Sequence, residues 1–212
     1  MAKANIPRIS SQVRQILDRE LGSHAQGHVS LDIKAERGRF HRGEHALKKY
    51  RVLESVPTYA LTMARAARSG LSGPERSGST LLIEWFSGLL GKVEIHEKKG
   101  QPALTRVSTG VLALDFEKLV RRIRGRSVRR RASAAEIRIL AVPGIHLLCL
   151  WKHWSKTPGK DQFIPVMLNF IGLRKGKVYS QSHVNRVVRG AAANVIVTWY
   201  ERQQQRDKPT DT

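Results

Sequence analysis

The chain has 212 residues, of which 41% are hydrophobic, so it can bury a core and is not a disordered basic tail. Lysine and arginine number 38 against 17 acidic residues, a formal net charge of +21 that predicts an anionic partner. Cys149 is the only cysteine, which excludes an internal disulfide and a cysteine-based zinc site and fits a reducing compartment.

Several elements are expected in the first third of the chain. Residues 10–21 predict a helix capped by Ser10 or Ser11, because apolar side chains recur on one face. Alternating apolar residues in 28–34 predict a strand. Residues 44–54 predict a second helix, and a third is expected to start at Pro57.

Residues 68–79 are rich in glycine and serine and predict a loop. This loop is the best internal boundary in a chain that otherwise reads as one domain, 1–204. The polar residues 205–212 predict a flexible tail.

The middle of the chain predicts strands around a turn at residues 98–102, then a third strand at 110–115. Residues 116–124 follow as a helix, because Phe116, Leu119, Val120 and Ile123 share one face. Gly125 is expected to end this helix.

The segment after the arginine-rich region sends two opposing signals. Ser133 and Glu136 have the spacing of a capping box and predict a helix from residue 134. Ile137 and Ile139, however, alternate around Arg138 as in a strand. The capping-box signal is preferred, so a helix is expected.

The remaining elements include a buried apolar segment at 145–154, a strand at 162–170 and a final helix from about 180 to 204. Together the pattern predicts an α+β fold, with helices packed on a small, mainly antiparallel sheet.

Residues 119–131 contain seven arginines, whose guanidinium groups bind phosphate through paired hydrogen bonds. They are expected to lie on the polar face of the 116–124 helix and on an exposed loop after it. More cations recur near 152–156 and 174–189, and would form a phosphate track if the segments share a face. The candidate nucleic-acid-binding residues are Lys118, Arg121, Arg122, Arg124, Arg126, Arg129, Arg130, Arg131, Lys152, Lys156, Arg174, Lys175, Lys177, Arg186 and Arg189.

Aromatic side chains near these cations could stack on bases. Trp154 is the candidate stacking residue, whereas Trp151 is expected in the core. Trp199 and Tyr200 form a second aromatic pair near Arg202.

Two short patterns suggest metal chemistry. His41, Glu44 and His45 match H-x-x-E-H, in which both histidines bind zinc and the glutamate acts as a base. Asp32 and Lys34 form a D-x-K pair like that of some magnesium-dependent nucleases. Cys149 lies in an apolar run, which predicts a buried, inert thiol.

These features predict a non-enzymatic nucleic-acid-binding protein without a cofactor, with DNA and RNA as open alternatives. A metal-dependent enzyme acting on nucleic acid and a basic scaffold that binds an acidic protein are the alternatives. Binding to a membrane surface through the 116–124 helix is a lesser one. The absence of a signal-peptide pattern and of a long apolar run predicts a cytoplasmic or nucleoid-associated protein.

Overall fold

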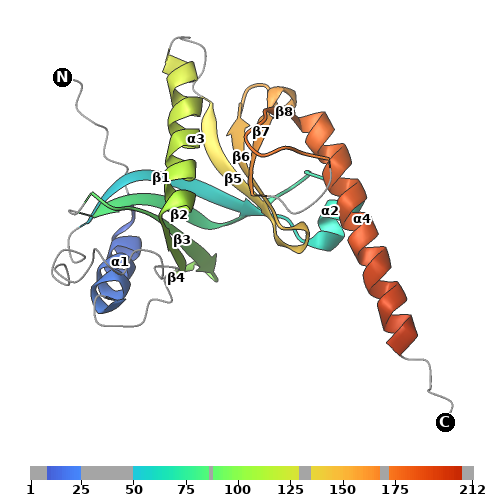
Figure 1. The fold of residues 1–212 in the computed structure, drawn as a ribbon, viewed down its shortest axis with the longest axis horizontal. Coiled ribbons are helices and arrows are strands. Elements are labelled where there is room, and N and C mark those ends of the chain that lie inside the picture. The colour runs from blue at the N-terminus through green and yellow to red at the C-terminus, as the bar shows by residue number, and fades with distance from the viewer. Residues whose placement is uncertain (1–8, 25–49, 86–87, 129–134, 168–171, 207–212) are drawn as a thin grey trace. The chain divides into compact units, whose positions relative to one another are not determined.

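The computed structural model describes residues 9–24, 50–85, 88–128, 135–167 and 172–206 (Figure 1). The chain divides into two compact units, residues 1–58 with 77–126 and residues 59–76 with 127–212. The described residues form four α-helices and eight strands, so the α+β class is confirmed. Eight strands are more than the small sheet that the sequence predicts.

The first unit contains two helices and four strands: α1 (Ser11–His24), β1 (Tyr50–Ala60), β2 (Glu75–Trp85), β3 (Leu90–Lys98), β4 (Gln101–Thr109) and α3 (Val111–Val128). Its strands are ordered β4-β3-β2-β1, and β2–β3 and β3–β4 are antiparallel. The ends of β1 and β2, residues 59–60 and 75–76, belong to the second unit.

Local signals explain two elements of the first unit. The Ser10 hydroxyl accepts a hydrogen bond from Val13 N at 3.2 Å, which caps α1 as predicted. In the β3–β4 hairpin, Lys99 and Gly100 have φ values of 52° and 76°. Two successive positive φ values are those of a type I′ turn, whose twist matches that of the flanking strands, and the predicted turn is confirmed.

The core of the first unit lies between α1 and its strands. Leu17 and Leu21 of α1 are buried against apolar residues of β2 and β3. Val93 pairs with Leu81 on one side and with Val107 on the other, so these three side chains form a row across the strands.

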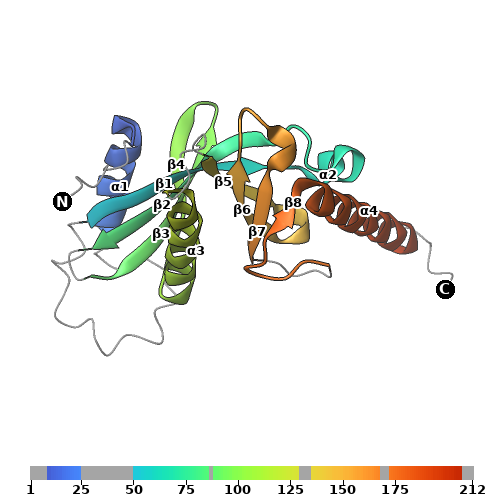
Figure 2. The ribbon, with the colours of Figure 1, turned by 90° about the horizontal axis from the view of Figure 1, so that it is seen from above.

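The second unit contains α2 (Met63–Ser69), β5 (Glu136–Val142), β6 (Leu147–His153), β7 (Gln162–Met167), β8 (Tyr179–Ser180) and α4 (Gln181–Arg206). Short 3₁₀ turns occupy Pro143–Ile145 and Pro158–Lys160. Strands β5, β6, β7 and β8 lie side by side in that order, each antiparallel to the next (Figure 2).

Helix α4 packs along α2 and then continues beyond it (Figure 1). Val184, Val188 and Ala192, spaced by four residues, are fully buried in the core of the second unit. After Ala192, α4 has no buried residue up to its end at Arg206. Trp199 is 55% exposed, so the second half of α4 presents apolar side chains to solvent.

Two helix predictions in the first third of the chain are wrong. Of the helix predicted at 44–54, residues 50–54 belong to β1 and residues 44–49 lie outside the described residues. Pro57, predicted to start a helix, lies inside β1. Helix α2 starts at Met63 instead, because Thr62 caps it by accepting a hydrogen bond from Arg65 N at 3.4 Å. The predicted loop at 68–79 is confined to residues 70–74, between α2 and β2.

Three predictions in the middle of the chain are also wrong. Residues 111–115 are the first turn of α3 and not a strand, and α3 continues past Gly125 to Val128. A helical glycine costs only about 1 kcal/mol relative to alanine, which neighbouring helix formers offset. The segment predicted as a helix from residue 134 forms strand β5 from Glu136.

The preference for a helix at residue 134 failed because a distant strand decides the structure. Strand β5 pairs along its whole length with β6, from Glu136 opposite His153 to Val142 opposite Leu147. The alternation of Ile137 and Ile139 was therefore the correct signal. The final helix is confirmed. Of the strand predicted at 162–170, residues 162–167 form β7, and residues 168–170 lie outside the described residues.

Candidate nucleic-acid interface

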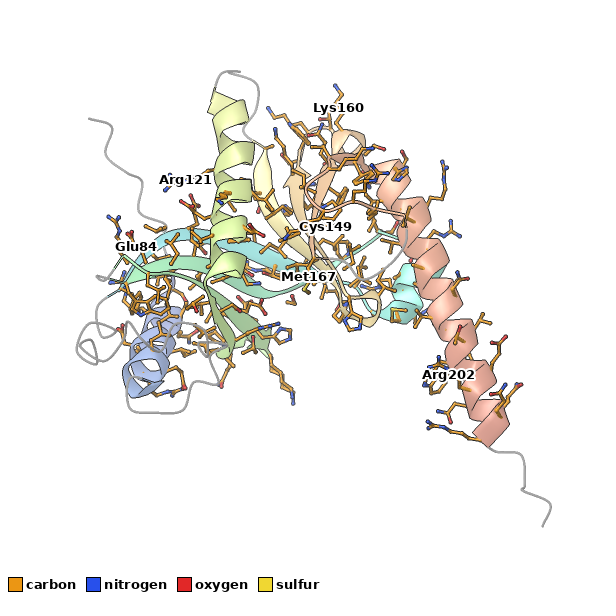
Figure 3. The ribbon with its side chains drawn as sticks, in the orientation of Figure 1. Glu84, Arg121, Cys149, Lys160, Met167 and Arg202 are labelled. Atoms are coloured by element: carbon orange, nitrogen blue, oxygen red, sulfur yellow. The ribbon has the colours of Figure 1, made fainter. Side chains whose placement is uncertain are left out.

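The second unit contains a long stretch that is almost free of carboxylates. Between residues 137 and 200, Asp161 is the only acidic residue, against nine lysines and arginines. Seven of these cations are exposed: Lys156, Lys160, Arg174, Lys175, Lys177, Arg186 and Arg189. We refer to these seven residues as the basic surface of the second unit. Lys160 extends into solvent from the β6–β7 connection (Figure 3).

The single carboxylate of this stretch is withdrawn from the surface. Asp161 is 3% exposed and accepts three hydrogen bonds. Trp151 Nε1 donates to Oδ2 at 2.7 Å, and Trp154 N donates to Oδ1 at 3.0 Å. His153 Nδ1 lies 2.9 Å from Oδ2. Hydrogen bonds of this kind stabilise a buried carboxylate, so Asp161 holds the β6–β7 turn and does not face the solvent.

The two tryptophans of β6 and its following turn have different environments. Trp151 is 8% exposed and stacks on Phe163, with ring centroids 5.7 Å apart, so its predicted place in the core is confirmed. Trp154 is partly exposed, and Lys152 Nζ lies 4.8 Å from its ring centroid. Stacking of a base on Trp154 stays a prediction.

Arg138 does not belong to the basic surface. Its guanidinium lies 4.9 Å from the ring centroids of both Tyr59 and Trp151 and is hydrogen-bonded to Glu136. This arrangement combines cation–π contacts with an ion pair, so Arg138 supports β5.

An open groove of about 540 Å³ runs between α2 and α4. It is lined by Ala67, Ser182, Asn185, Arg186, Arg189 and Ala193. Five of these residues come from α4 at spacings that place them on one helical face, and none carries a carboxylate. The groove brings together the predicted phosphate ligands Arg186 and Arg189.

Asn185 connects α4 to the end of α2. Leu71 N donates to Asn185 Oδ1 at 2.7 Å, just after Gly70 ends α2. Gly70 has a φ of 60°, and a Cβ at this position would overlap Asn185 Oδ1. Glycine is therefore required for this close approach of the two helices.

The predicted cations of α3 belong to the first unit, whereas the basic surface belongs to the second unit. Lys118 and Arg121 are exposed, and Arg121 forms an ion pair with Glu117, four residues earlier. The side chains of Arg122, Arg124 and Arg126 and the residues Arg129, Arg130 and Arg131 lie outside the described part of the chain. The joint phosphate track therefore stays a prediction.

The patterns that suggested metal chemistry fall on residues 25–49. Asp32, Lys34, His41, Glu44 and His45 lie outside the described residues. Elsewhere, in the five described ranges of the chain, no group of three or more His, Cys, Asp or Glu could hold a metal ion. These patterns stay predictions.

Among the residues that the structure describes, two titratable groups have clearly shifted pKa values. Cys149 is buried, as predicted, and burial raises the pKa of its thiol to about 12. The inertness of this thiol stays a prediction. Burial and a hydrogen bond to Asp18 both raise the pKa of the Tyr50 phenol, which donates to Asp18 Oδ1 at 2.8 Å.

The role of Asp161 was not predicted, although the sequence shows it as the one acidic residue between residues 137 and 200.

Comparisons with known protein families, curated proteins and solved structures find no match for this chain. In the described part of the chain, no helix is long and apolar enough to cross a membrane.

Proposed function

We propose that the protein binds nucleic acid, without catalysing a reaction on it, through phosphate contacts made by the basic surface of the second unit. The observation that supports this proposal is the absence of any exposed carboxylate between residues 137 and 200, where nine cations occur. An ordinary solvent-exposed face mixes both signs of charge, and a one-sided surface repels itself unless a polyanion neutralises it.

Phosphate contacts of this kind do not read sequence. Arginine and lysine neutralise phosphates and release condensed counterions, so affinity falls steeply with salt. Duplex DNA should give a slope of log affinity against log salt of about −0.9 per neutralised phosphate. DNA and RNA remain equal alternatives, because the contacts involve the backbone that both share.

The arginines of α3 are proposed as a second, weaker contribution. Arg121 forms an ion pair with Glu117, so it should contribute less to phosphate binding than a cation without a nearby carboxylate. Three further arginines follow α3 in the chain and remain proposed phosphate ligands: Arg129, Arg130 and Arg131.

Fluorescence anisotropy with labelled DNA and RNA of the same sequence tests the proposal. We compare two triple variants that remove the same charges: Lys156→Gln, Lys160→Gln, Arg174→Gln, and the control Lys98→Gln, Lys99→Gln, Arg106→Gln. All six side chains belong to exposed residues, but the control residues lie in the first unit.

We expect the first variant to lose about tenfold in affinity at low salt and to reduce the salt slope by about one per lost contact. The control should retain affinity to within about threefold, because its residues contribute only net charge. Equal losses of affinity in both variants would show that the basic surface makes no specific contact with the nucleic acid. Absence of binding to any nucleic acid at low salt would refute the function itself.

A further inference from the structure

The groove between α2 and α4 offers a specific set of hydrogen-bond donors. Arg186 and Arg189 supply two guanidinium groups. Ser182 adds a hydroxyl whose Oγ lies 3.1 Å from Ser180 Oγ, so it can donate to a ligand when it accepts from Ser180. The guanidinium groups remain charged at any relevant pH and bind phosphate oxygens in pairs.

Asn185 adds an oriented amide to these donors. Its Oδ1 must face Leu71 N, because a backbone N–H can pair only with an acceptor. The orientation of the amide is therefore set by α2, and its NH2 group is left to donate elsewhere. Asn185 also lines the groove, and the inference assigns this NH2 donor to a ligand bound there.

The groove matches a phosphomonoester better than an internal phosphodiester. A terminal phosphate carries a charge of about −1.5 to −2 and three strong acceptor oxygens, whereas an internal phosphate has charge −1 and two free oxygens. Two guanidinium groups balance the terminal group, and the hydroxyl and amide can bind its remaining acceptor sites. The volume of about 540 Å³ exceeds what one phosphate fills and leaves room for the attached nucleotide.

The walls of the groove are consistent with this ligand. Ala67 and Ala193 line it with short side chains, which do not obstruct a nucleotide, and no carboxylate lines it. We propose that the groove binds the terminal phosphate of a nucleic-acid strand. This inference rests on the proposed function and adds recognition of the strand end to it.

The test compares three labelled single-stranded oligonucleotides of one sequence, with a 5′-phosphate, a 3′-phosphate or hydroxyls at both ends. Dissociation constants are measured by anisotropy in one buffer. We expect one phosphorylated oligonucleotide to bind about tenfold more tightly than the hydroxyl form, as two charge-assisted contacts predict. The arm that shows the preference identifies the strand end.

Two variants connect this preference to the groove. Arg186→Gln with Arg189→Gln should abolish it, whereas the control Arg202→Gln with Arg206→Gln removes the same charge from exposed residues of α4 outside the groove and should preserve it. Asn185→Asp keeps the acceptor for Leu71 N but places a carboxylate in the groove, so it should also abolish the preference.

The possible results separate the two proposals. Equal binding of all three oligonucleotides by the unmodified protein overturns the end-recognition proposal and leaves general binding intact. A preference that survives both groove variants also overturns it. Failure to bind any of the three at low salt refutes the proposed function and the inference together.

Discussion

Replacing Asp161 with asparagine keeps the shape of the side chain but removes its charge and one acceptor oxygen. Either orientation of the new amide leaves one donor unpaired. If Oδ1 stays opposite Trp154 N, the NH2 group faces Trp151 Nε1, which can only donate. If the amide is turned, its NH2 group faces the backbone N–H of Trp154 instead. His153 can adapt by changing tautomer, so it does not add to the conflict.

The cost follows from this conflict. Asp161 is 3% exposed and Trp151 is 8% exposed, so water cannot replace the lost partner. An unsatisfied buried donor costs about 1–3 kcal/mol. The free energy of unfolding of Asp161→Asn should therefore be lower by about this amount.

Urea denaturation followed by tryptophan fluorescence and circular dichroism measures this change. Glu201→Gln is the matched control, because it makes the same chemical change at an exposed residue of α4 and should cost less than about 0.5 kcal/mol. Equal stability of the two variants would refute the reasoning that Asp161 holds the β6–β7 turn. Nucleic-acid affinity of folded Asp161→Asn should not fall, since the Asp161 side chain is buried and its replacement removes a negative charge.

The remaining predictions concern packing and reactivity. Val188→Ala truncates a fully buried side chain and should lower the free energy of unfolding by about 2 kcal/mol. Its control, Val197→Ala, changes a residue that is 55% exposed and should be neutral or stabilising, because alanine favours helix. Urea denaturation of the two variants measures the difference. The Cys149 thiol, with a pKa of about 12, should not react with a thiol reagent near about pH 8 until denaturant is added, and reaction of the native protein would contradict its burial. Gly70→Ala should lower the melting temperature, because its Cβ would overlap Asn185; an unchanged melting temperature would show that the helices can separate there.

Elements with strong local signals could be predicted from the sequence. The cap at Ser10, the turn at Lys99 and Gly100, and the final helix all depend on residues close together in the chain. The capping-box spacing of Ser133 and Glu136 was also a local signal, but pairing of β5 with β6 overrode it. Residues 50–54 were assigned wrongly for a similar reason, because the strand depends on neighbours distant in the sequence.

The candidate site could be predicted only in part. The basic composition around Arg186 and Arg189 was evident, and both residues line the groove. The groove itself could not be predicted, because Leu71 and Asn185 are 114 residues apart and no periodicity connects them. The second unit combines residues 59–76 with 127–212, which no linear boundary in the sequence indicates.

The Asn185 side chain has both a structural role and a proposed binding role. Its Oδ1 accepts from Leu71 N and so stabilises the end of α2, whereas its NH2 group is the part that we propose binds the phosphate. The two roles can be separated by chemistry, because aspartate retains the acceptor and loses the donor, whereas alanine loses both. Asn185→Asp should therefore keep the melting temperature of the protein more closely than Asn185→Ala and still lose discrimination of the terminal phosphate. If the aspartate and alanine variants lower the melting temperature equally, the contact with Leu71 N does not orient the amide. The geometric basis for a phosphate-binding site in this groove is then lost.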